Sequence, residues 1–69
     1  MPDSKTIGKR IAALREKKGL TQAQLARLIG VGTSTVTMWE IGERIPRDEM
    51  KVKLAEQLGR SVKFIFFDD

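Results

Sequence analysis

The sequence predicts an all-α domain built from five short helices. Three kinds of observation support this class: apolar residues recur at helical spacing, glycines separate the periodic segments, and capping residues stand where the segments begin. The chain has 69 residues, with no cysteine and no histidine. Disulfides and the usual zinc ligands are therefore absent, so a core this small depends on hydrophobic packing or on self-association.

The first predicted helix covers residues 4–18. Its apolar residues are spaced by three and four positions, as one face of a helix requires: Ile7, Ile11 and Leu14. Gly19 follows at the position where a helix commonly ends in a left-handed residue. Lys17 and Lys18 precede it, and their charges suit the negative end of the helix dipole.

A second helix of only two turns is predicted to begin after Thr21. Gln24 stands three residues further on, which completes a capping-box pattern. The apolar face before Gly30 follows directly: Leu25, Ala26, Leu28 and Ile29. An isolated helix of this length is marginal in water, so tertiary packing must hold it.

A third helix is predicted over residues 33–41, against the local propensity of this segment. Its β-branched residues favour a strand. Val36 and Trp39, however, are three positions apart, and predicted helices flank the segment on both sides. We therefore expect packing to override the local preference. The same spacing assigns Trp39 to the core and not to a base-stacking position.

The last two elements are a helix after Pro46 and a short helix over residues 61–67. Acidic residues in the first turn favour the start of the fourth helix, and Gly59 ends it. Its expected buried face is Met50, Leu54, Ala55 and Leu58. Ser61 is a candidate cap for the final helix, with Val62, Ile65 and Phe66 facing inward. A short apolar strand over 62–67 is the alternative, because periodicity does not distinguish the two.

The charge distribution favours an anionic partner. The net charge is +4, and the sequence pI is about 9.9. Seven basic against two acidic residues give +5 over residues 1–39, whereas six against seven give −1 over residues 40–69. Ordinary solvation of small helices is the alternative explanation. No apolar run is long enough to span a bilayer and no signal-peptide core is visible, so we expect a cytoplasmic protein without membrane contact.

Residues 20–42 form the most informative segment, because two short helices flank a tight Gly-Val-Gly turn. This arrangement is typical of a helix-turn-helix, here over about residues 21–41. Ala26 is small enough for close helix contact, and Gly30 can adopt the positive φ that such a turn requires. Val31 and Val36 can fill the angle between the helices. Four residues then remain on the outward face of the second helix: Thr33, Ser34, Thr37 and Met38.

The segment and its surroundings resemble the Cro/CI-type, or Xre-type, helix-turn-helix family of phage and bacterial repressors. The resemblance covers about residues 7–67 and rests on Leu20, Thr21, Gln22, Leu25, Ala26, Gly30, Val31, Ser34, Val36, Trp39, Glu40, Gly42, Pro46, Leu54, Ala55, Leu58 and Gly59. It implies a compact five-helix, lambda-repressor-like DNA-binding domain that occupies residues 1–69. It also implies binding to a double-stranded operator as a homodimer, and regulation of transcription.

The motif and the resemblance together predict the DNA contacts. The groove-facing residues are expected to be Thr33, Ser34, Thr37 and Met38. Backbone contacts are expected from Gln22, Thr21, Arg44, Arg47, Lys9 and Arg10, with Thr21 equally suited to be a plain helix cap. Arg15 and Glu40 resemble a family pair that ties the first helix to the end of the third. The alternative for that pair is a solvent-exposed ion pair of little energetic value.

The sequence departs from the family at two points. Gly32 replaces the Ser or Thr that usually caps the recognition helix, which weakens that cap by a few tenths of a kcal/mol. The outward face also lacks the Arg, Gln or Asn that can form bidentate contacts to purine edges. Hydroxyl groups and a methionine can make single hydrogen bonds or pack on a thymine methyl group. We therefore expect DNA shape and phosphate positioning to contribute to specificity.

The C-terminal segment carries more apolar surface than a small core needs. Phe64 and Phe67 fall outside the inward stripe under helical spacing, so both are candidates for the dimer contact. Partial burial against the fourth helix is the alternative for both rings.

Three functional hypotheses follow from the sequence. The first is a homodimeric, sequence-specific repressor or Cro-like regulator. The second is an antitoxin or a restriction–modification control protein, which shares the motif and differs in its partner. The third is a protein-interaction adaptor that has lost DNA binding. An enzyme is disfavoured because no nucleophile, base and orienting group can be assembled from these side chains, and we expect no cofactor and no metal.

Overall fold

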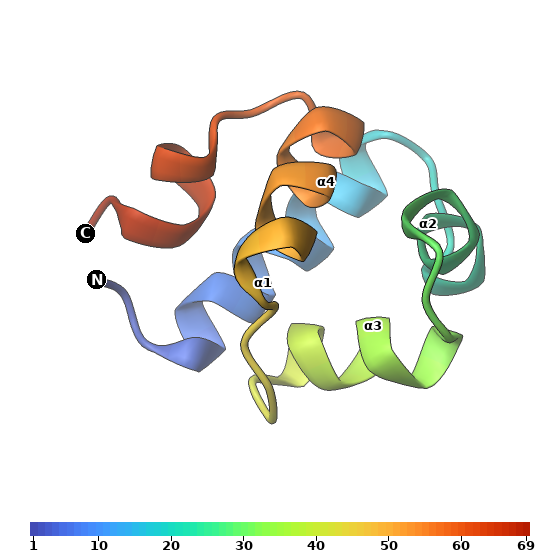
Figure 1. Cartoon of the computed structure of the whole chain (residues 1–69), viewed down its shortest axis with the longest axis horizontal. Coiled ribbons are helices and arrows are strands. Elements are labelled where there is room, and N and C mark those ends of the chain that lie inside the picture. The colour runs from blue at the N-terminus through green and yellow to red at the C-terminus, as the bar shows by residue number, and fades with distance from the viewer.

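The structure, a computed structural model, describes all 69 residues and contains only helices and loops. The elements are α1 (Ser4–Lys17), α2 (Gln22–Ile29), α3 (Thr33–Ile41), α4 (Asp48–Leu58) and the short π-helical segment η1 (Lys63–Phe67). Figure 1 shows α3 along one side of the molecule, with α1 and α4 across from it and the two termini close together. The all-α prediction is confirmed. None of the helices is both long and apolar enough to cross a membrane.

Helix ends lie where glycines and capping side chains predict them. At the start of α2, the Thr21 hydroxyl accepts from the Gln24 N–H at 3.0 Å, and the Gln24 side chain accepts from the Thr21 N–H at 2.8 Å. This reciprocal pair is the expected capping box. The start of α1 has a cap that we did not predict: Asp3 accepts from the Thr6 N–H at 2.8 Å, and this hydrogen bond lowers the pKa of Asp3.

The core is a single cluster of apolar residues contributed by all five elements. It contains Ile7, Ile11, Leu25, Ala26, Ile29, Val36, Trp39, Leu54, Leu58, Ile65 and Phe66. Val36 is fully buried and Trp39 nearly so, which confirms the helical prediction for the β-branched segment. Since α3 packs on both α1 and α2, tertiary contacts outweigh the weak helix propensity of its residues.

The tightest helix contact joins α1 to the C-terminal end of α3. A Cβ atom on Gly8 would lie 2.5 Å from the carbonyl oxygen of Trp39 and closer still to that of Glu40. Gly42, which follows α3 with φ +84°, is in a similarly tight contact. A Cβ atom added to it would lie 3.0 Å from the Cα of Lys5. The two backbones therefore approach each other where neither residue has a side chain, and this contact sets the position of α3.

The C-terminal segment is helical, so the strand alternative for residues 62–67 is wrong. The Ser61 hydroxyl accepts from the Phe64 N–H at 3.0 Å, as expected of a cap. The predicted helix over 61–67 is regular only over Lys63–Phe67, where it is wound as one π-helical turn. Both Ile65 and Phe66 reach the core in this turn, and Val62 packs at its edge.

Substitution of Gly8 by Ala tests the contact between α1 and α3. In a free helix this change gains about 0.5–1 kcal/mol, whereas overpacking a tight contact costs about 1–3 kcal/mol. The obstructing atoms here are main-chain oxygens that cannot rotate away, so we expect a net loss of about 2 kcal/mol in unfolding free energy. Urea denaturation measures the change. Ala13→Leu on the exposed face of α1 is the control, expected to shift stability by less than about 0.5 kcal/mol. A Gly8→Ala variant as stable as the parent would contradict the contact.

Candidate nucleic-acid interface

The α2–α3 unit has the geometry of a helix-turn-helix. Gly30 adopts φ +89° at the end of α2, as the sequence predicts for this turn. The Val31 N–H donates to the Ala26 carbonyl at 3.0 Å, which closes the turn onto α2. Ala26 is buried, so its small side chain allows the two helices to pack closely. Gly32 caps α3 without a side-chain hydrogen bond, as its lack of a hydroxyl requires.

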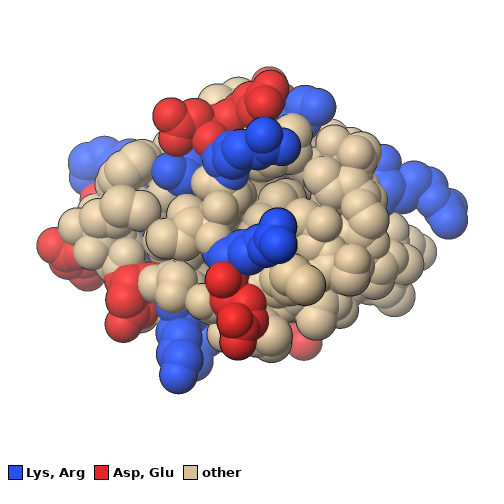
Figure 2. All heavy atoms as spheres, turned by 60° about the horizontal axis from the view of Figure 1, so that its bottom comes forward, with Lys and Arg blue, Asp and Glu red and all other residues tan.

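The outward face of α3 presents short or uncharged side chains. Thr33, Ser34 and Met38 are exposed, and Thr37 is half-buried. Figure 2 shows the side on which α3 lies, where a broad uncharged area is bordered by lysine and arginine side chains with acidic ones among them. Such a face can approach a surface closely because it carries no charged side chain and three of its four residues are short.

Thr37 differs from the other three residues because its hydroxyl has a partner inside the protein. It donates to the Gln22 side-chain oxygen at 2.7 Å. This bond joins α3 to the first residue of α2 and was not predicted. No sequence pattern marks it, because the two residues belong to different helices whose relative position only the fold determines.

Glu40 is the centre of a hydrogen-bonded network that includes this pair. Its carboxylate accepts from Arg15 Nε at 2.6 Å and Nη2 at 3.0 Å, and from the Gln22 amide at 2.9 Å. Arg15 Nη1 also donates to the Leu20 carbonyl at 2.7 Å. The network therefore fastens α1, α2, α3 and the loop before α2 to one another, with no unpaired buried side-chain polar atom.

The Arg15–Glu40 pair is shielded from solvent, so the solvent-exposed alternative is wrong. The side chains of Arg15 and Glu40 are only 12% and 5% exposed. Hydrogen bonds to the Glu40 carboxylate raise the pKa of Arg15 above its usual value. A pair desolvated to this degree contributes little net stability, but removing one member leaves the other uncompensated.

Gln22 and Thr21 keep donor groups available despite their internal bonds. Gln22 uses one amide hydrogen on Glu40, which leaves the other free. The Thr21 hydroxyl accepts as the cap of α2 and can still donate its own proton. Both residues lie at the helix N-terminus, where the first N–H groups have no acceptor within the helix.

Two arginines flank the loop after α3. Arg44 and Arg47 are exposed and help to line a hollow of about 430 Å³. Its other lining residues come from the turn, from α3, from the loop and from α4: Gly30, Val31, Thr35, Trp39, Ile45 and Met50. The N–H groups of Glu43 and Arg44 donate to the Met38 carbonyl at 2.9 and 3.3 Å, so the loop is held against the end of α3.

The structure separates the two basic candidates on α1. Lys9 is exposed and forms no ion pair. Arg10 is half-buried, and its Nη1 donates to the carbonyls of Phe64 and Ile65 at 3.0 and 3.3 Å. Arg10 therefore has a structural role, because its guanidinium donates to carbonyls of the C-terminal turn, and its DNA contact stays a prediction.

The C-terminal rings are also unequal. Phe64 is half-buried at the edge of the core, with the Arg60 guanidinium 3.5 Å from its ring centre. This is the partial burial that we gave as the alternative to a dimer contact. Phe67 is 47% exposed, with Lys51 Nζ 5.3 Å from its ring centre. Of these two rings, therefore, only Phe67 retains a large exposed apolar surface for another molecule.

Comparison with known proteins identifies the family. A family model described as helix-turn-helix matches residues 11–65, which is most of the chain. This chain belongs to the helix-turn-helix family of DNA-binding transcriptional regulators. The resemblance to Cro/CI-type repressors that the sequence indicated is confirmed by the relatives that follow.

Two curated relatives and two solved structures illustrate the similarity of this helix-turn-helix chain to known regulators. The Repressor protein C2 of Salmonella phage P22 is 30% identical over 97% of this chain and 31% of its own. An uncharacterised regulator of Archaeoglobus fulgidus is 34% identical, with 87% of each chain covered. The crystal structure of the P22 c2 repressor with synthetic operator 9T has a TM-score of 0.87, at 32% identity over 91% of this chain and 96% of that one. The restriction–modification controller protein C.AhdI of Aeromonas hydrophila has a TM-score of 0.83, at 35% identity over 90% and 94%.

The coverage of these relatives limits what they imply. The chain spans about a third of the length of the phage P22 repressor and most of the length of the archaeal regulator. The similarity therefore concerns the helix-turn-helix domain itself. In this chain that domain contains both the Arg15–Glu40 network and α3.

Replacing Glu40 by Gln tests the importance of the network. The variant keeps the shape of the side chain but leaves the desolvated Arg15 charge with only the exposed Glu16 carboxylate, 3.9 Å away, as a counter-charge. Breaking a buried pair in this way costs about 3–5 kcal/mol, and we expect a loss near the lower end because Gln can still accept one hydrogen bond. Chemical denaturation provides the measurement. Glu43→Gln, at an exposed position, should change stability by less than about 0.5 kcal/mol. Equal effects of the two substitutions would show that the network does not hold the helices.

Proposed function

We propose that this chain acts as a transcriptional repressor that binds a double-stranded operator as a homodimer. The observation that carries the proposal is the α3 helix: its outer face is uncharged and accessible, while its inner face is fixed by the core, Gly8 and Glu40. A rigid helix with an accessible outer face is what insertion into a major groove requires. The similarity to a repressor solved with its operator supports the same conclusion.

Base contacts in this proposal come from three of the four predicted groove residues. Thr33 and Ser34 carry free hydroxyl groups that can make one hydrogen bond each to a base edge. Met38 offers a flexible apolar contact to thymine methyl groups. Thr37 is less suited to direct readout because its hydroxyl proton is already used by Gln22. Its role in the proposal is to hold Gln22 in place.

Phosphate contacts come from both ends of the helix-turn-helix. At the start of α2, Gln22 and Thr21 provide free donors beside unpaired backbone N–H groups, an arrangement that suits an anion. At the end of α3, Arg44 and Arg47 provide two charges on a loop that is hydrogen-bonded to Met38. The two groups come from different segments, the start of α2 and the loop after α3, so together they can fix the orientation of α3 relative to the duplex.

Self-association in this proposal involves Phe67. A half-site buried by one small domain offers limited contact area, and a two-fold operator doubles it when two copies bind. Burying a phenylalanine contributes about 1.5–3 kcal/mol, and this ring is roughly half exposed. One such contact per subunit supports only a weak dimer, which DNA binding then strengthens by linkage.

A restriction–modification controller is the second candidate function. The similarity to C.AhdI covers nearly the full length of both chains at 35% identity, which favours this function beyond the shared motif. Both candidates need the same DNA contacts and differ in the genes they control. The gene that neighbours this one distinguishes them, because a control protein accompanies a methyltransferase and a nuclease.

Selection of bound sequences from random duplexes is the direct test of the proposed function. We expect an enriched pseudo-palindrome whose half-sites are one helical turn apart, about 34 Å between centres. The Ser34→Ala variant, selected in parallel, should lose preference at one base pair in each half-site and retain it elsewhere. Recovery of no enriched motif would overturn the proposal and favour a protein-interaction adaptor.

Arg47→Ala examines the phosphate contacts. The change should weaken binding to all duplexes by a similar factor. It should also reduce the slope of log Kd against log salt by about 0.9, the value for one released counterion. Fluorescence anisotropy at several salt concentrations gives both quantities. Lys53→Ala, an exposed residue on α4, serves as the control and should leave the slope unchanged. A change in which base is preferred would instead make Arg47 a readout residue.

Phe67→Ser examines the dimer. We expect an unchanged helical circular-dichroism spectrum, with a lower dimer fraction in sedimentation and a lower operator affinity. Leu28→Ser is a matched control, because Leu28 is similarly exposed at 51% but belongs to α2. If the wild type sediments as a monomer at high micromolar concentration and Phe67→Ser binds the operator normally, the dimer contact lies elsewhere.

A further inference from the structure

The outer face of α3 carries two exposed apolar side chains. Met38 is 38% exposed, and Ile41, which we did not predict as a contact residue, is 57% exposed. Ser34, Met38 and Ile41 follow one another at spacings of four and three residues, which places them on one side of the helix. The buried Val36 and Trp39 occupy the other side. The two apolar groups therefore face the molecule that α3 binds.

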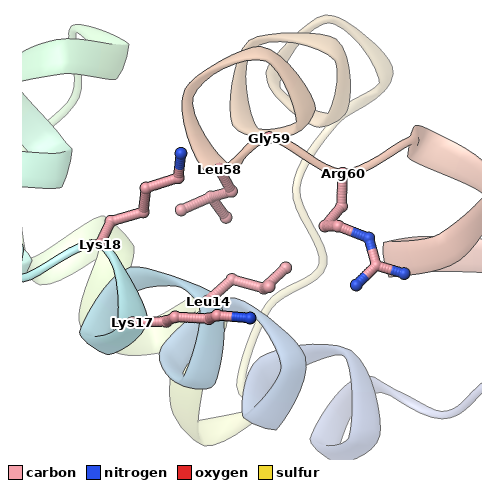
Figure 3. A pocket seen from close by; sticks show the side chains of 6 residues that line it. All are labelled: Leu14, Lys17, Lys18, Leu58, Gly59 and Arg60. Carbon is pink, nitrogen blue, oxygen red and sulfur yellow. The ribbon is translucent and has the colours of Figure 1, made fainter.

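The hollow between the C-terminal ends of α1 and α4 offers no comparable apolar surface. Figure 3 shows Leu14 and Leu58 at its centre, and these side chains are half-buried and buried, respectively. Lys17 and Lys18 beside them offset the negative end of the α1 dipole. This hollow therefore needs no ligand to cover its apolar residues, in contrast to the outer face of α3.

The polar groups on the same face of α3 give only limited discrimination between bases. Thr33 and Ser34 offer hydroxyl groups, which both donate and accept, so each can bond to thymine O4 or to cytosine N4. Thr37 has already given its hydroxyl proton to Gln22. In addition, α3 contains no arginine, lysine, asparagine or glutamine that could form a bidentate contact with a purine. A large part of base discrimination is thus left to the apolar groups of α3.

The C5-methyl group of thymine is the apolar group that the bases present in the major groove. Cytosine has a hydrogen atom at C5, whereas 5-methylcytosine carries the same methyl group at the same place. Met38 has a flexible, polarizable side chain that can adjust to such a group, and Ile41 extends the apolar surface by about one helical turn. Since burial of the methyl group supplies the free energy, the ring that carries it matters little for this contact.

We propose, on the basis of the operator binding proposed above, that Met38 and Ile41 read C5-methyl groups of pyrimidines in the major groove. Thymine and 5-methylcytosine are then equivalent partners for these side chains, whereas cytosine and uracil are not. Methylation of cytosine at C5 therefore strengthens binding at positions where thymine is preferred. The DNA that this chain recognises includes duplexes that are methylated at those positions.

Three libraries of random duplexes test the proposal, each selected with the full chain. The first contains the ordinary bases, the second contains uracil in place of thymine, and the third contains uracil and 5-methylcytosine. We expect the first library to give a motif with thymine at defined positions of each half-site. The second library should show no preference at those positions, and the third should regain it with 5-methylcytosine where thymine stood.

Fluorescence anisotropy on the selected duplex gives the size of the effect. Replacing one contacted thymine by uracil should weaken binding about fourfold, the value for one buried methyl group. The double variant M38S/I41S should bind the thymine and uracil duplexes within about twofold of each other. L28S is the matched control, because Leu28 is exposed on α2, and it should keep the difference of the parent. Circular dichroism verifies that both variants are folded.

The outcomes separate this proposal from the proposed function. The same motif with equal preference in the thymine and uracil libraries would overturn the reading of methyl groups and leave the repressor function intact. An equal effect of uracil on the parent, M38S/I41S and L28S would assign the methyl dependence to DNA shape and overturn the contact. No enriched motif in any of the three libraries would contradict the proposed function itself.

Discussion

The Glu40 carboxylate is the point on which the arrangement of this molecule depends. It accepts two hydrogen bonds from Arg15 of α1 and one from Gln22 of α2, and it belongs to α3 itself. This one carboxylate thereby holds α1, α2 and α3 to one another. A desolvated ion pair is a poor source of net stability, but its geometry is strict. Its main contribution is orientation, and the orientation of α3 is what a DNA-binding domain must control.

The stability that permits this arrangement comes from the apolar core. Neither α2 nor α3 exceeds nine residues, so neither is stable in isolation. Since α2 packs on α4 and α3 packs on α1, each is held through buried residues of the shared core such as Leu25 and Trp39. The division of roles is clear: the core supplies the free energy, while Glu40 and the absence of a side chain at Gly8 determine the exact approach of the helices.

The sequence predicts those features that local chemistry determines. The start of α2 follows from Thr21 and Gln24, and the positions of α3 and α4 follow from glycines and apolar spacing. Apart from the Asp3 cap of α1, the groups that no prediction found share another property: their partners lie far away along the chain. Arg10 donates to carbonyls more than fifty residues away, and Gln22 meets Thr37 only after α2 and α3 have packed. Such pairs depend on the relative position of whole helices, which no residue pattern encodes.

The contact between α1 and α3 has a consequence for how target choice can change during evolution. Gly8 contacts main-chain atoms of α3 and no side chain. The position of α3 on α1 therefore does not depend on which residues occupy its outer face. Positions 33, 34 and 38 are exposed and can accept new side chains with little effect on folding. Thr37 alone is tied to the scaffold, through Gln22. Lineages that descend from such a domain can therefore acquire new binding preferences in single steps, without an intermediate that fails to fold.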